Sequence, residues 1–431
     1  MRQKRTLVYT WIMASVLMGS WGETAFGGGY AIPPQTAKAE SMGGVGAAGV
    51  DDPSAVYVNP AALSQIDGNE IQGGMTYINT LSSVKNSGAR SKNIHDDDFV
   101  PNLFASYRIP DSKISVGIGS YTPFGLATSY KPNAFTRYAA IRSELRTLFI
   151  TPTLAWEPVS YLSVGAGISV VHASGTLSRA IFLGPAGDGK LRITDTDNAY
   201  GYKIGVLLKP ITGLKLGLVY TSHVDVHFDS ANVKFVDALG SGGLATQTKA
   251  SGIHLPAPAV INAAIHWQID PRWGIELQYD YVRWSKFKEL KAAFSTPLPA
   301  LGGLVPITGF LLPQNWQDSS SLRIGTAYKV TEEFEVRAGL ALDETPIPSS
   351  TLGPVIPGAD YLSLAGGIGY KWQRLKFDFG YMAVFYKTRR VTNNILETGG
   401  ESSALPFPGV PGKDKYSVFQ NLIGLHATYR F

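Results

Sequence analysis

Beyond residue 68 the chain is dominated by alternation of apolar with polar or small residues. At the C-terminus, Leu425, Tyr429 and Phe431 belong to an apolar set at every second position, and His426 and Arg430 belong to the set between them. Successive side chains of a β-strand point to opposite faces, so this pattern predicts a strand with one apolar face. The pattern recurs along the chain. We expect about fourteen strands, which begin near residues 69, 99, 114, 144, 162, 197, 214, 255, 273, 317, 334, 360, 375 and 416.

The connections between these strands alternate between short and long. Alternation of side chains alone does not distinguish a soluble sandwich, with its apolar faces inward, from a membrane barrel, with its apolar face toward lipid. Outer-membrane barrels combine an even number of strands with short periplasmic turns and long outer loops, so the connection lengths favour an all-β transmembrane barrel. The short connections fall at 110–111, 157–158, 209–210, 270–271, 331–332 and 373–374, and the long ones at 81–98, 127–143, 181–196, 229–254, 288–316, 343–359 and 392–415.

Aromatic residues cluster beside the short connections. Tyr and Trp side chains favour the bilayer interface, where the ring and its polar tip are both satisfied. We therefore interpret the cluster as the periplasmic aromatic girdle, although aromatic core residues at strand ends are the alternative. Its members are Trp156, Tyr161, Trp267, Trp273, Tyr370 and Trp372.

Composition agrees with a protein that meets lipid and excludes several other classes. Charged residues make up 16% of the chain, whereas soluble domains carry about a quarter. There is no cysteine, which excludes disulfides and thiolate metal sites. The net charge of +5 is spread along the chain without a basic block, so we expect no nucleic-acid partner.

The N-terminus predicts export. Arg2, Lys4 and Arg5 precede an apolar stretch that runs from Leu7 to about Trp21, which is the pattern of a signal peptide. The stretch is slightly short for a membrane helix, which needs about 20 apolar residues. We assign residues 1–27 to the signal peptide, with cleavage between residues 22 and 27.

Residues 28–68 do not alternate. They contain a small-residue run at 41–50 and turn or helix-start residues at 51–53. A segment of this size cannot form its own core. We expect a partly helical hatch that folds into the lumen of the barrel at 69–431, and a disordered periplasmic leader is the alternative.

Three features resemble the FadL-like outer-membrane transporters of long-chain fatty acids and aromatic hydrocarbons. The first is the segment from Gly29 to Asn59-Pro60-Ala61, which resembles the family's N-terminal hatch. The second is Tyr121-Thr122-Pro123-Phe124-Gly125. The third runs from Trp316 through Leu322-Arg323-Ile324-Gly325 and Asp343-Glu344-Thr345-Pro346 to Tyr370. Together they span nearly the whole chain in the family's order.

The resemblance implies a monomeric barrel of fourteen strands, plugged by the hatch, in the outer membrane of a Gram-negative bacterium. Substrate would enter from the outer loops by passive, ligand-gated diffusion and leave sideways through a gap made by a kinked third strand. Asn59, Pro60 and Ala61 would lie at that kink. The terminal Phe431 is similar to the signal read by the barrel-assembly machinery, and lipid and lipopolysaccharide would surround the barrel.

Glycine and proline residues supply a local reason for the kink. Gly117 and Gly119 lie in the third strand, Pro123 follows it, and Phe124 and Gly125 complete the motif. Glycine and proline weaken a strand ladder. The alternative is that the two strand glycines only make room for the hatch.

The two longest outer loops are unusually apolar. A hydrophobic solute gains roughly 0.8 kcal/mol per buried methylene in an apolar site, so these loops could capture ligand, or they could pack on each other over the barrel mouth. The candidate capture residues are Val233, Phe235, Val236, Leu239, Phe294, Leu298, Leu304, Phe310 and Leu311. A fatty-acid carboxylate would need a cation, for which Arg323, Arg337 and Lys376 are candidates unless nearby acidic residues pair with them.

Motifs that suggest other chemistry fail their context tests. The run from Gly44 to Gly49 satisfies GxGxxG, but no strand precedes it. His223 and His227 lie on a predicted strand, where four residues span about 13 Å, too far to share a metal. We expect no catalytic constellation, cofactor or metal site. The rival functions are a general porin for polar solutes and a barrel enzyme or adhesin.

Overall fold

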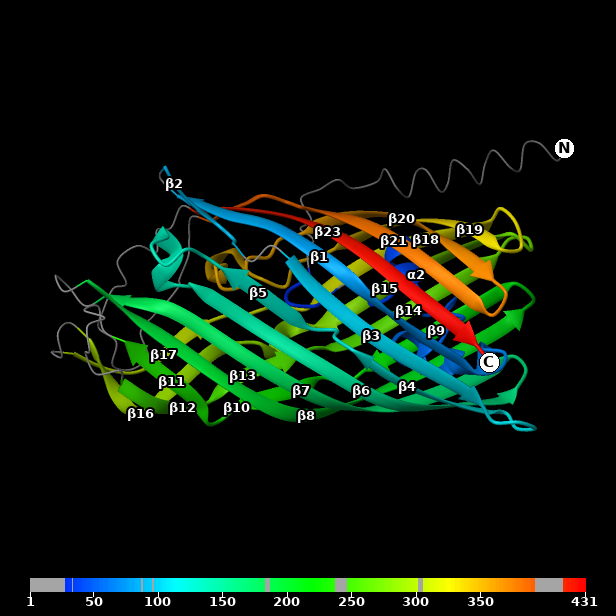
Figure 1. Cartoon of the computed structure of the whole chain (residues 1–431), viewed down its shortest axis with the longest axis horizontal. Helices are drawn as coiled ribbons and strands as arrows, with labels where there is room; N and C mark the ends of the chain where they lie inside the picture. Colours follow the sequence, from blue (N-terminus) through cyan, green and yellow to red (C-terminus); the bar gives the residue numbers. More distant parts are fainter. Residues whose placement is uncertain are drawn as a thin grey trace.

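A computed structural model describes residues 28–32, 34–86, 88–94, 97–182, 187–236, 246–300, 305–391 and 414–431. Fourteen strands form a closed antiparallel barrel, as the sequence predicts (Figure 1). They are β1 (Glu70–Asn86), β3 (Asp97–Arg108), β4 (Ile114–Tyr121) with its continuation β5 (Gly125–Ser129), β6 (Arg142–Val159), β7 (Leu162–Phe182), β8 (Asp188–Ile211), β9 (Leu214–Thr221), β14 (Ala259–Gln268), β15 (Trp273–Arg283), β18 (Ser319–Lys329), β19 (Phe334–Asp343), β20 (Tyr361–Trp372), β21 (Leu375–Tyr386) and β23 (Asp414–Arg430).

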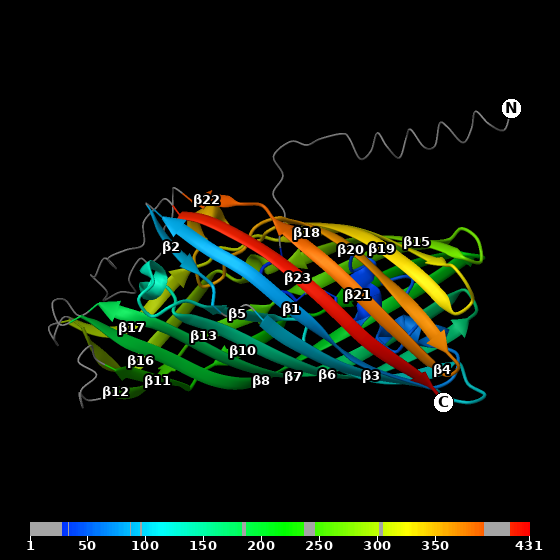
Figure 2. The same ribbon diagram turned by 45° about the horizontal axis from the view of Figure 1, so that its top comes forward.

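The barrel closes where its first and last strands meet. β1 pairs with β23 from Glu70↔Arg430 to Lys85↔Lys415, and the two ribbons run side by side in Figure 2. The backbone N–H of Phe431 donates to the carbonyl of Asn69 at 3.0 Å. Closure pairs the outer edges of the two end strands, so these edges do not become sites of aggregation.

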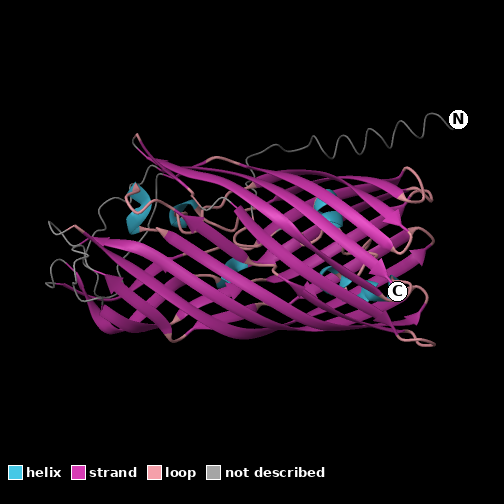
Figure 3. Cartoon of the chain, in the orientation of Figure 1, coloured by secondary structure: helices cyan, strands magenta, loops and turns pink. Residues whose placement is uncertain are grey.

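Short strands and helical turns complete the described chain, and most of the helices lie within the outline of the barrel in Figure 3. The additional strands are β2 (Ala89–Lys92), β10 (Val224–Phe228), β11 (Ala231–Val236), β12 (Thr246–Ser251), β13 (Ile253–Ala257), β16 (Glu289–Ala300), β17 (Val305–Pro313) and β22 (Arg389–Val391). The helices are α2 (Ala37–Ser41) and α3 (Ala55–Val58), with 3-10 helices η1 (Pro60–Gln65), η2 (Phe135–Tyr138), η4 (Trp284–Lys286) and η6 (Ser349–Thr351). None of the helices in the described ranges is long and apolar enough to cross a membrane.

The apolar faces of the strands point outward. Leu103, Ile168 and Leu425 are each more than half exposed, whereas Gln72 and Thr151 are buried on the inner faces. This inversion of the soluble arrangement is the one that a lipid environment favours. The aromatic residues beside the short turns are also exposed, which fits their interpretation as an interfacial girdle.

The predicted boundaries hold for most strands and fail where long loops carry strands of their own. β8 begins at Asp188 rather than near residue 197, because the β7–β8 hairpin continues far beyond the barrel ring. The connection at 229–254 contains β11 and β12, and the connection at 288–316 contains β16 and β17. These strands pair with β8 and with one another, so the outer loops form an extension of the wall.

The N-terminal residues 28–68 lie inside the barrel. Luminal glycines of the strands make room for their backbone: a Cβ at Gly380 would collide with Ala37, one at Gly217 with Ala47, and one at Gly165 with Pro60. The small-residue run also binds the wall by hydrogen bonds, since the N–H groups of Gly46 and Ala47 donate to the Gln278 amide at 3.1 and 3.0 Å. We call residues 28–68 the luminal segment.

Candidate functional site

The barrel wall is interrupted between β3 and β5. β3 pairs with β4 only from Leu103↔Ser120 to Arg108↔Ser115, and β5 pairs only with β6. Residues 99–102 of β3 pair with β1, but the ladder between β3 and β4 does not extend to them. β4 ends at Tyr121 and β5 begins at Gly125, so the chain leaves the ladder at 122–124, where Pro123 has no N–H to donate.

A cavity of about 580 Å³ lies at this interruption. Phe99, Val100 and Pro101 line it from β3, and Gly125 to Thr128 line it from β5. Beyond the cavity the wall is joined again, because the N–H of Ile94 donates to the carbonyl of Ser129 at 2.8 Å. The opening is therefore bounded above and below by hydrogen-bonded chain.

The first residues of the luminal segment bind the kink. The N–H of Ile32 donates to the Pro123 carbonyl at 2.9 Å, and the N–H of Gly125 donates to the Tyr30 carbonyl at 3.0 Å. Residues 28–32 thus supply hydrogen bonds that an uninterrupted β3 would have made. Phe124 forms an isolated bridge with Ala31 at the same point.

The expected position of Asn59, Pro60 and Ala61 at the kink is wrong. Asn59 lies against β8: its amide donates to the carbonyls of Ala47 at 2.6 Å and Val206 at 3.3 Å, and its Oδ1 accepts from the N–H of Ala61 at 3.1 Å. Pro60 packs on Gly165 of β7. The segment folds back on itself, and the sequence does not show which of its parts reaches the third strand.

Gly117 and Gly119 lie within a regular part of β4, which pairs with β3 on one side and β6 on the other. A Cβ at Gly117 would lie 2.7 Å from Val56, and one at Gly119 would lie 2.6 Å from Phe104. Both positions therefore leave room for interior side chains, and the bend itself lies at 122–124.

A cluster of aromatic rings covers the kink from inside. Tyr30 is at its centre, with ring centroids 4.7 Å from Trp284, 6.0 Å from Phe287, 5.6 Å from Trp316 and 6.3 Å from Phe124. Burial raises the pKa of the Tyr30 phenol, so its hydroxyl stays neutral and donates to the Pro256 carbonyl at 2.5 Å. The cluster continues from Phe124 to Phe149 at 6.1 Å and from Phe149 to Tyr121 at 5.8 Å.

A second cavity, of about 180 Å³, lies among these rings and shares Gly28, Ala31 and Ile32 with the cavity at the interruption. Tyr121, Phe124, Phe149 and Trp284 line it, together with Tyr57 of the luminal segment and Lys203 of β8. Aromatic rings combined with polar groups such as Asn262 and Gln278 are typical of sites for ligands with a large apolar surface. We refer to it as the aromatic cavity.

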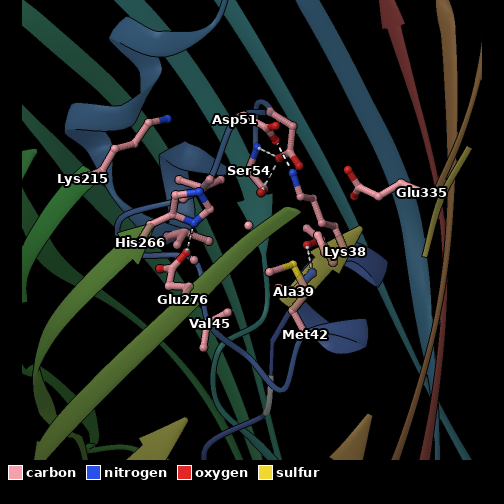
Figure 4. Close-up of a pocket in the computed structure, with 18 of the residues that line it drawn as sticks. Lys38, Ala39, Met42, Val45, Asp51, Ser54, Lys215, His266, Glu276 and Glu335 are labelled. Carbon is pink, nitrogen blue, oxygen red and sulfur yellow. Dashed lines mark hydrogen bonds and ion pairs between the residues drawn. The ribbon is translucent and has the colours of Figure 1, made fainter. Parts of the chain in front are cut away.

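A third cavity, of about 140 Å³, is lined by charged side chains and lies beside the short turns (Figure 4). Lys38 forms an ion pair with Asp51, and His266 lies 3.4 Å from Glu276. Lys215 and Glu335 approach it from opposite sides. Its charges do not suit an apolar ligand.

The cations expected to hold a carboxylate already have acidic partners. Arg323 lies 2.6 Å from both Asp280 and Asp343. Arg337 lies 2.6 Å from Glu335 and 2.7 Å from Asp378, and Lys376 lies 3.8 Å from Asp378. Acidic residues therefore pair with all three of these cations.

The apolar residues of the outer loops pack on each other. Val233, Phe235, Phe294, Leu298 and Phe310 are buried, and the Phe294 and Phe310 ring centroids are 6.4 Å apart. Val236 and Leu311 are half-buried. Leu239 and Leu304 lie outside the described residues. Capture of ligand by these loops stays a prediction.

Trp284, Phe287 and Lys203 were not among the predicted site residues. The positions of the tryptophans could have identified Trp284. Between residues 28 and 431, Trp284 and Trp316 are the two tryptophans that do not lie beside a short turn. An aromatic residue away from the girdle needs another reason for its position. Lys203 has no such signal, because it resembles any polar inward position of a strand.

Comparison with known proteins decides the family. A family model described as outer membrane protein transport protein (OMPP1/FadL/TodX) matches residues 18–431. The chain belongs to this family. It is 27% identical over 359 residues to a long-chain fatty acid transport protein of Escherichia coli O6:H1, which covers 74% of this chain and 78% of that protein. It is 26% identical over 411 residues to a 47 kDa outer membrane protein of Pasteurella multocida, which covers 89% and 90%.

Solved structures of family members share the fold. A Pseudomonas aeruginosa FadL homologue has a TM-score of 0.79 and 21% identity, covering 94% of this chain and 100% of that one. The Pseudomonas putida toluene transporter TodX has a TM-score of 0.69 and 18% identity, covering 93% and 99%. This member of the OMPP1/FadL/TodX family is an outer-membrane transport protein with a closed barrel of fourteen strands.

Proposed function

We propose that this protein carries small hydrophobic molecules, either long-chain fatty acids or aromatic and alkane hydrocarbons, across the outer membrane by passive diffusion. The ligand passes from the outer loops to the aromatic cavity and leaves sideways through the interruption between β3 and β5. The observation that carries the proposal is the position of the aromatic cluster directly behind a break in the wall. The named substrates of the E. coli and P. putida relatives support both classes.

The energetics favour a lateral path over an axial one. An apolar solute that left through the periplasmic end would meet the charged cavity of Lys38, Asp51 and Glu276 and then water. The interruption instead opens beside outward apolar residues of β3, such as Phe99 and Leu103, which are 66% and 52% exposed. The solute keeps roughly 0.8 kcal/mol per methylene when it passes from an apolar cavity to lipid.

A general porin requires an open lumen, and the luminal segment occupies the lumen of this barrel. Its backbone lies against Gly380, Gly217 and Gly165, which belong to strands around the ring. We propose that the segment acts as a hatch. A steady, large ion current through the purified protein in a planar bilayer would favour the porin.

The experiment that tests the lateral path closes the interruption. Because the chain has no cysteine, a pair at Val100→Cys and Leu126→Cys can be joined across the opening by a thiol-reactive crosslinker that dithiothreitol reverses. Both residues line the cavity, one from each edge. We expect uptake of labelled oleate or toluene by cells to fall at least about fivefold after crosslinking and to return after reduction, because the crosslink spans the proposed apolar exit.

A matched pair at Ile168→Cys and Tyr202→Cys provides the control. These exposed residues are register partners within the intact β7–β8 ladder, so their crosslink does not span the opening. Cells without the gene set the background. Equal uptake through both crosslinked variants would refute the lateral path, and equal uptake with and without the gene would refute transport.

The proposal includes the partners implied by an outer-membrane barrel. Phe431 is exposed and directly follows the closing strand β23, a position accessible to the barrel-assembly machinery. Lipid and lipopolysaccharide contact the outward apolar band, and the protein acts as a monomer without a cofactor. Removal of Phe431 should reduce the amount of barrel in the outer membrane.

A further inference from the structure

Lys203 is a buried cation of the aromatic cavity that has no acidic partner among the described residues. Its side chain extends from β8 toward the luminal segment and is 6% exposed. Its ammonium donates to the carbonyl of Tyr57 and lies 4.6 Å from the centroid of the Tyr57 ring. A carbonyl and an aromatic face carry only partial negative charge, so they compensate a buried ammonium incompletely.

The other charged groups of this cavity already have ion-pair or hydrogen-bond partners. Asp280 and Asp343 both bind Arg323, and the Glu344 carboxylate accepts from the N–H of Ser320 at 2.9 Å. Asp280, Arg323 and Asp343 lie on β15, β18 and β19, and Glu344 directly follows β19. Lys203 instead lies on β8, with hydroxyl-bearing neighbours. Ser169 and Ser222 line the cavity on the side of Lys203.

We propose that Lys203 is the residue that selects the head group of the transported ligand, and that the aromatic cavity takes an amphiphile with a carboxylate rather than a neutral hydrocarbon. The inference rests on the proposed function and deepens it. The carboxylate binds the ammonium in place of the Tyr57 carbonyl, and hydroxyls such as that of Ser169 can donate to its second oxygen. The chain of the ligand lies along Phe124 and Phe149, toward the opening between β3 and β5.

The physical reason for selection is the cost of an incompletely compensated buried charge. A carboxylate brings the full opposite charge into a site shielded from water, where charge-assisted hydrogen bonds are about twice as strong as neutral ones. An alcohol of the same length brings the same apolar surface without the charge. The difference in affinity between the acid and the alcohol therefore measures the contribution of Lys203.

The alternative is that Lys203 only fastens the end of α3 to the wall through the Tyr57 carbonyl. That role predicts the same loss of affinity for every ligand when the lysine is removed, because it would act through the position of the luminal segment. The two roles are separated by the head group of the probe.

The experiment measures binding of oleate and of oleyl alcohol to the purified full-length protein in a nonionic detergent, by quenching of tryptophan fluorescence. Trp284 lines the aromatic cavity and reports occupancy. The variants are Lys203→Met, Lys203→Arg and, as a matched control, Lys215→Met, which removes a luminal lysine from the charged cavity instead. Heat-dependent electrophoretic mobility confirms that each barrel is folded.

We expect the wild-type protein to bind oleate at least about tenfold more tightly than oleyl alcohol, which corresponds to about 1.4 kcal/mol. Lys203→Met should abolish this preference: the affinity for oleate should fall at least about tenfold, while the affinity for oleyl alcohol should change less than about threefold. Lys203→Arg and Lys215→Met should keep the preference.

An equal loss for both probes in Lys203→Met, or no loss for oleate, would overturn the inference. If oleyl alcohol and toluene bind and enter cells whatever stands at residue 203, the proposed transport survives and the head-group selection fails. If neither probe binds the wild-type protein, both fail.

Discussion

Asn59 should be the residue whose loss most loosens the luminal segment. Its side chain joins three parts of the structure: it caps η1 through the N–H of Ala61, it holds the turn at Ala47, and it reaches the carbonyl of Val206 in the wall. The side chain is fully buried, so water cannot replace these bonds. Asn59→Ala removes all three contacts without adding bulk.

The expected cost follows from these contacts. Loss of an N-cap costs about 1 kcal/mol, and a buried carbonyl left without its donor costs about 1–3 kcal/mol. Together the substitution should favour local opening of the segment by roughly 2–4 kcal/mol, which is about 30- to 1,000-fold. Asn59→Asp should keep the cap but bring a carboxylate against the two carbonyls, so it should not rescue the segment.

Hydrogen exchange read by mass spectrometry measures this opening. Peptides from residues 44–65 of Asn59→Ala should lose protection by the factor above, while peptides from β6 to β8 keep theirs. The control is Asn232→Ala, which removes an exposed amide of β11 that accepts a hydrogen bond from Lys249 of β12. Protection of residues 44–65 within about twofold of wild type, in a folded barrel, would show that Asn59 does not hold the segment and would refute the reasoning.

Three further outcomes are expected. Trp284→Ala should lower the affinity for oleate and for oleyl alcohol alike, at least about fivefold in equilibrium dialysis, because a ring of the aromatic cavity is lost; unchanged affinity would place the ligand elsewhere. Ile150→Arg should destabilise the barrel by about 2–4 kcal/mol in urea unfolding, since Ile150 is 43% exposed on the lipid face and lies far along β6 from the interface, whereas Trp156→Arg near the interface should cost about 0–1 kcal/mol; equal costs would contradict the proposed membrane position. Burial raises the pKa of the Glu40 carboxyl on α2 to about 8, despite its hydrogen bond with Thr76. Because the carboxyl is neutral at low pH, the luminal segment is most stable there, and the hydrogen-exchange protection of α2 should fall as the pH rises from about 4.5 to 8. Glu40→Gln should make that protection independent of pH.

Much of the barrel could be predicted from the sequence, because the decisive property is local. Alternation with a period of two marks a strand and its apolar face within a few residues, and short turns such as 373–374 mark where two strands meet at the periplasmic end. The starts of β4, β7 and β15 at Ile114, Leu162 and Trp273 agree with the predicted ones. The asymmetry of loop lengths was sufficient to predict that the apolar face points outward.

Within the candidate site, Pro123 lies where the chain leaves the ladder, but Gly117 and Gly119 lie in a regular part of β4, and the residues that contact the break are not the predicted ones. Proline has no backbone N–H in any context, so Pro123 by itself predicts a missing hydrogen bond in the strand ladder. The motif of Asn59, Pro60 and Ala61 was assigned to the kink, but Tyr30 and Ile32 hold that position. A segment that folds back on itself inside a barrel can present any of its parts to the third strand.

By itself, the sequence determined an outward-apolar barrel of fourteen strands, its closed order and the compact segment before it. Only the tertiary structure decided which luminal charges are paired and which is left to a ligand. Arg323 and Lys203 look alike along the chain, as inward cations of regular strands, but Arg323 meets Asp280 and Asp343 across the ring while Lys203 meets a carbonyl of the luminal segment, 146 residues away in the chain. Such contacts depend on barrel closure, strand register and the path of the segment together, and no short stretch of sequence contains all three.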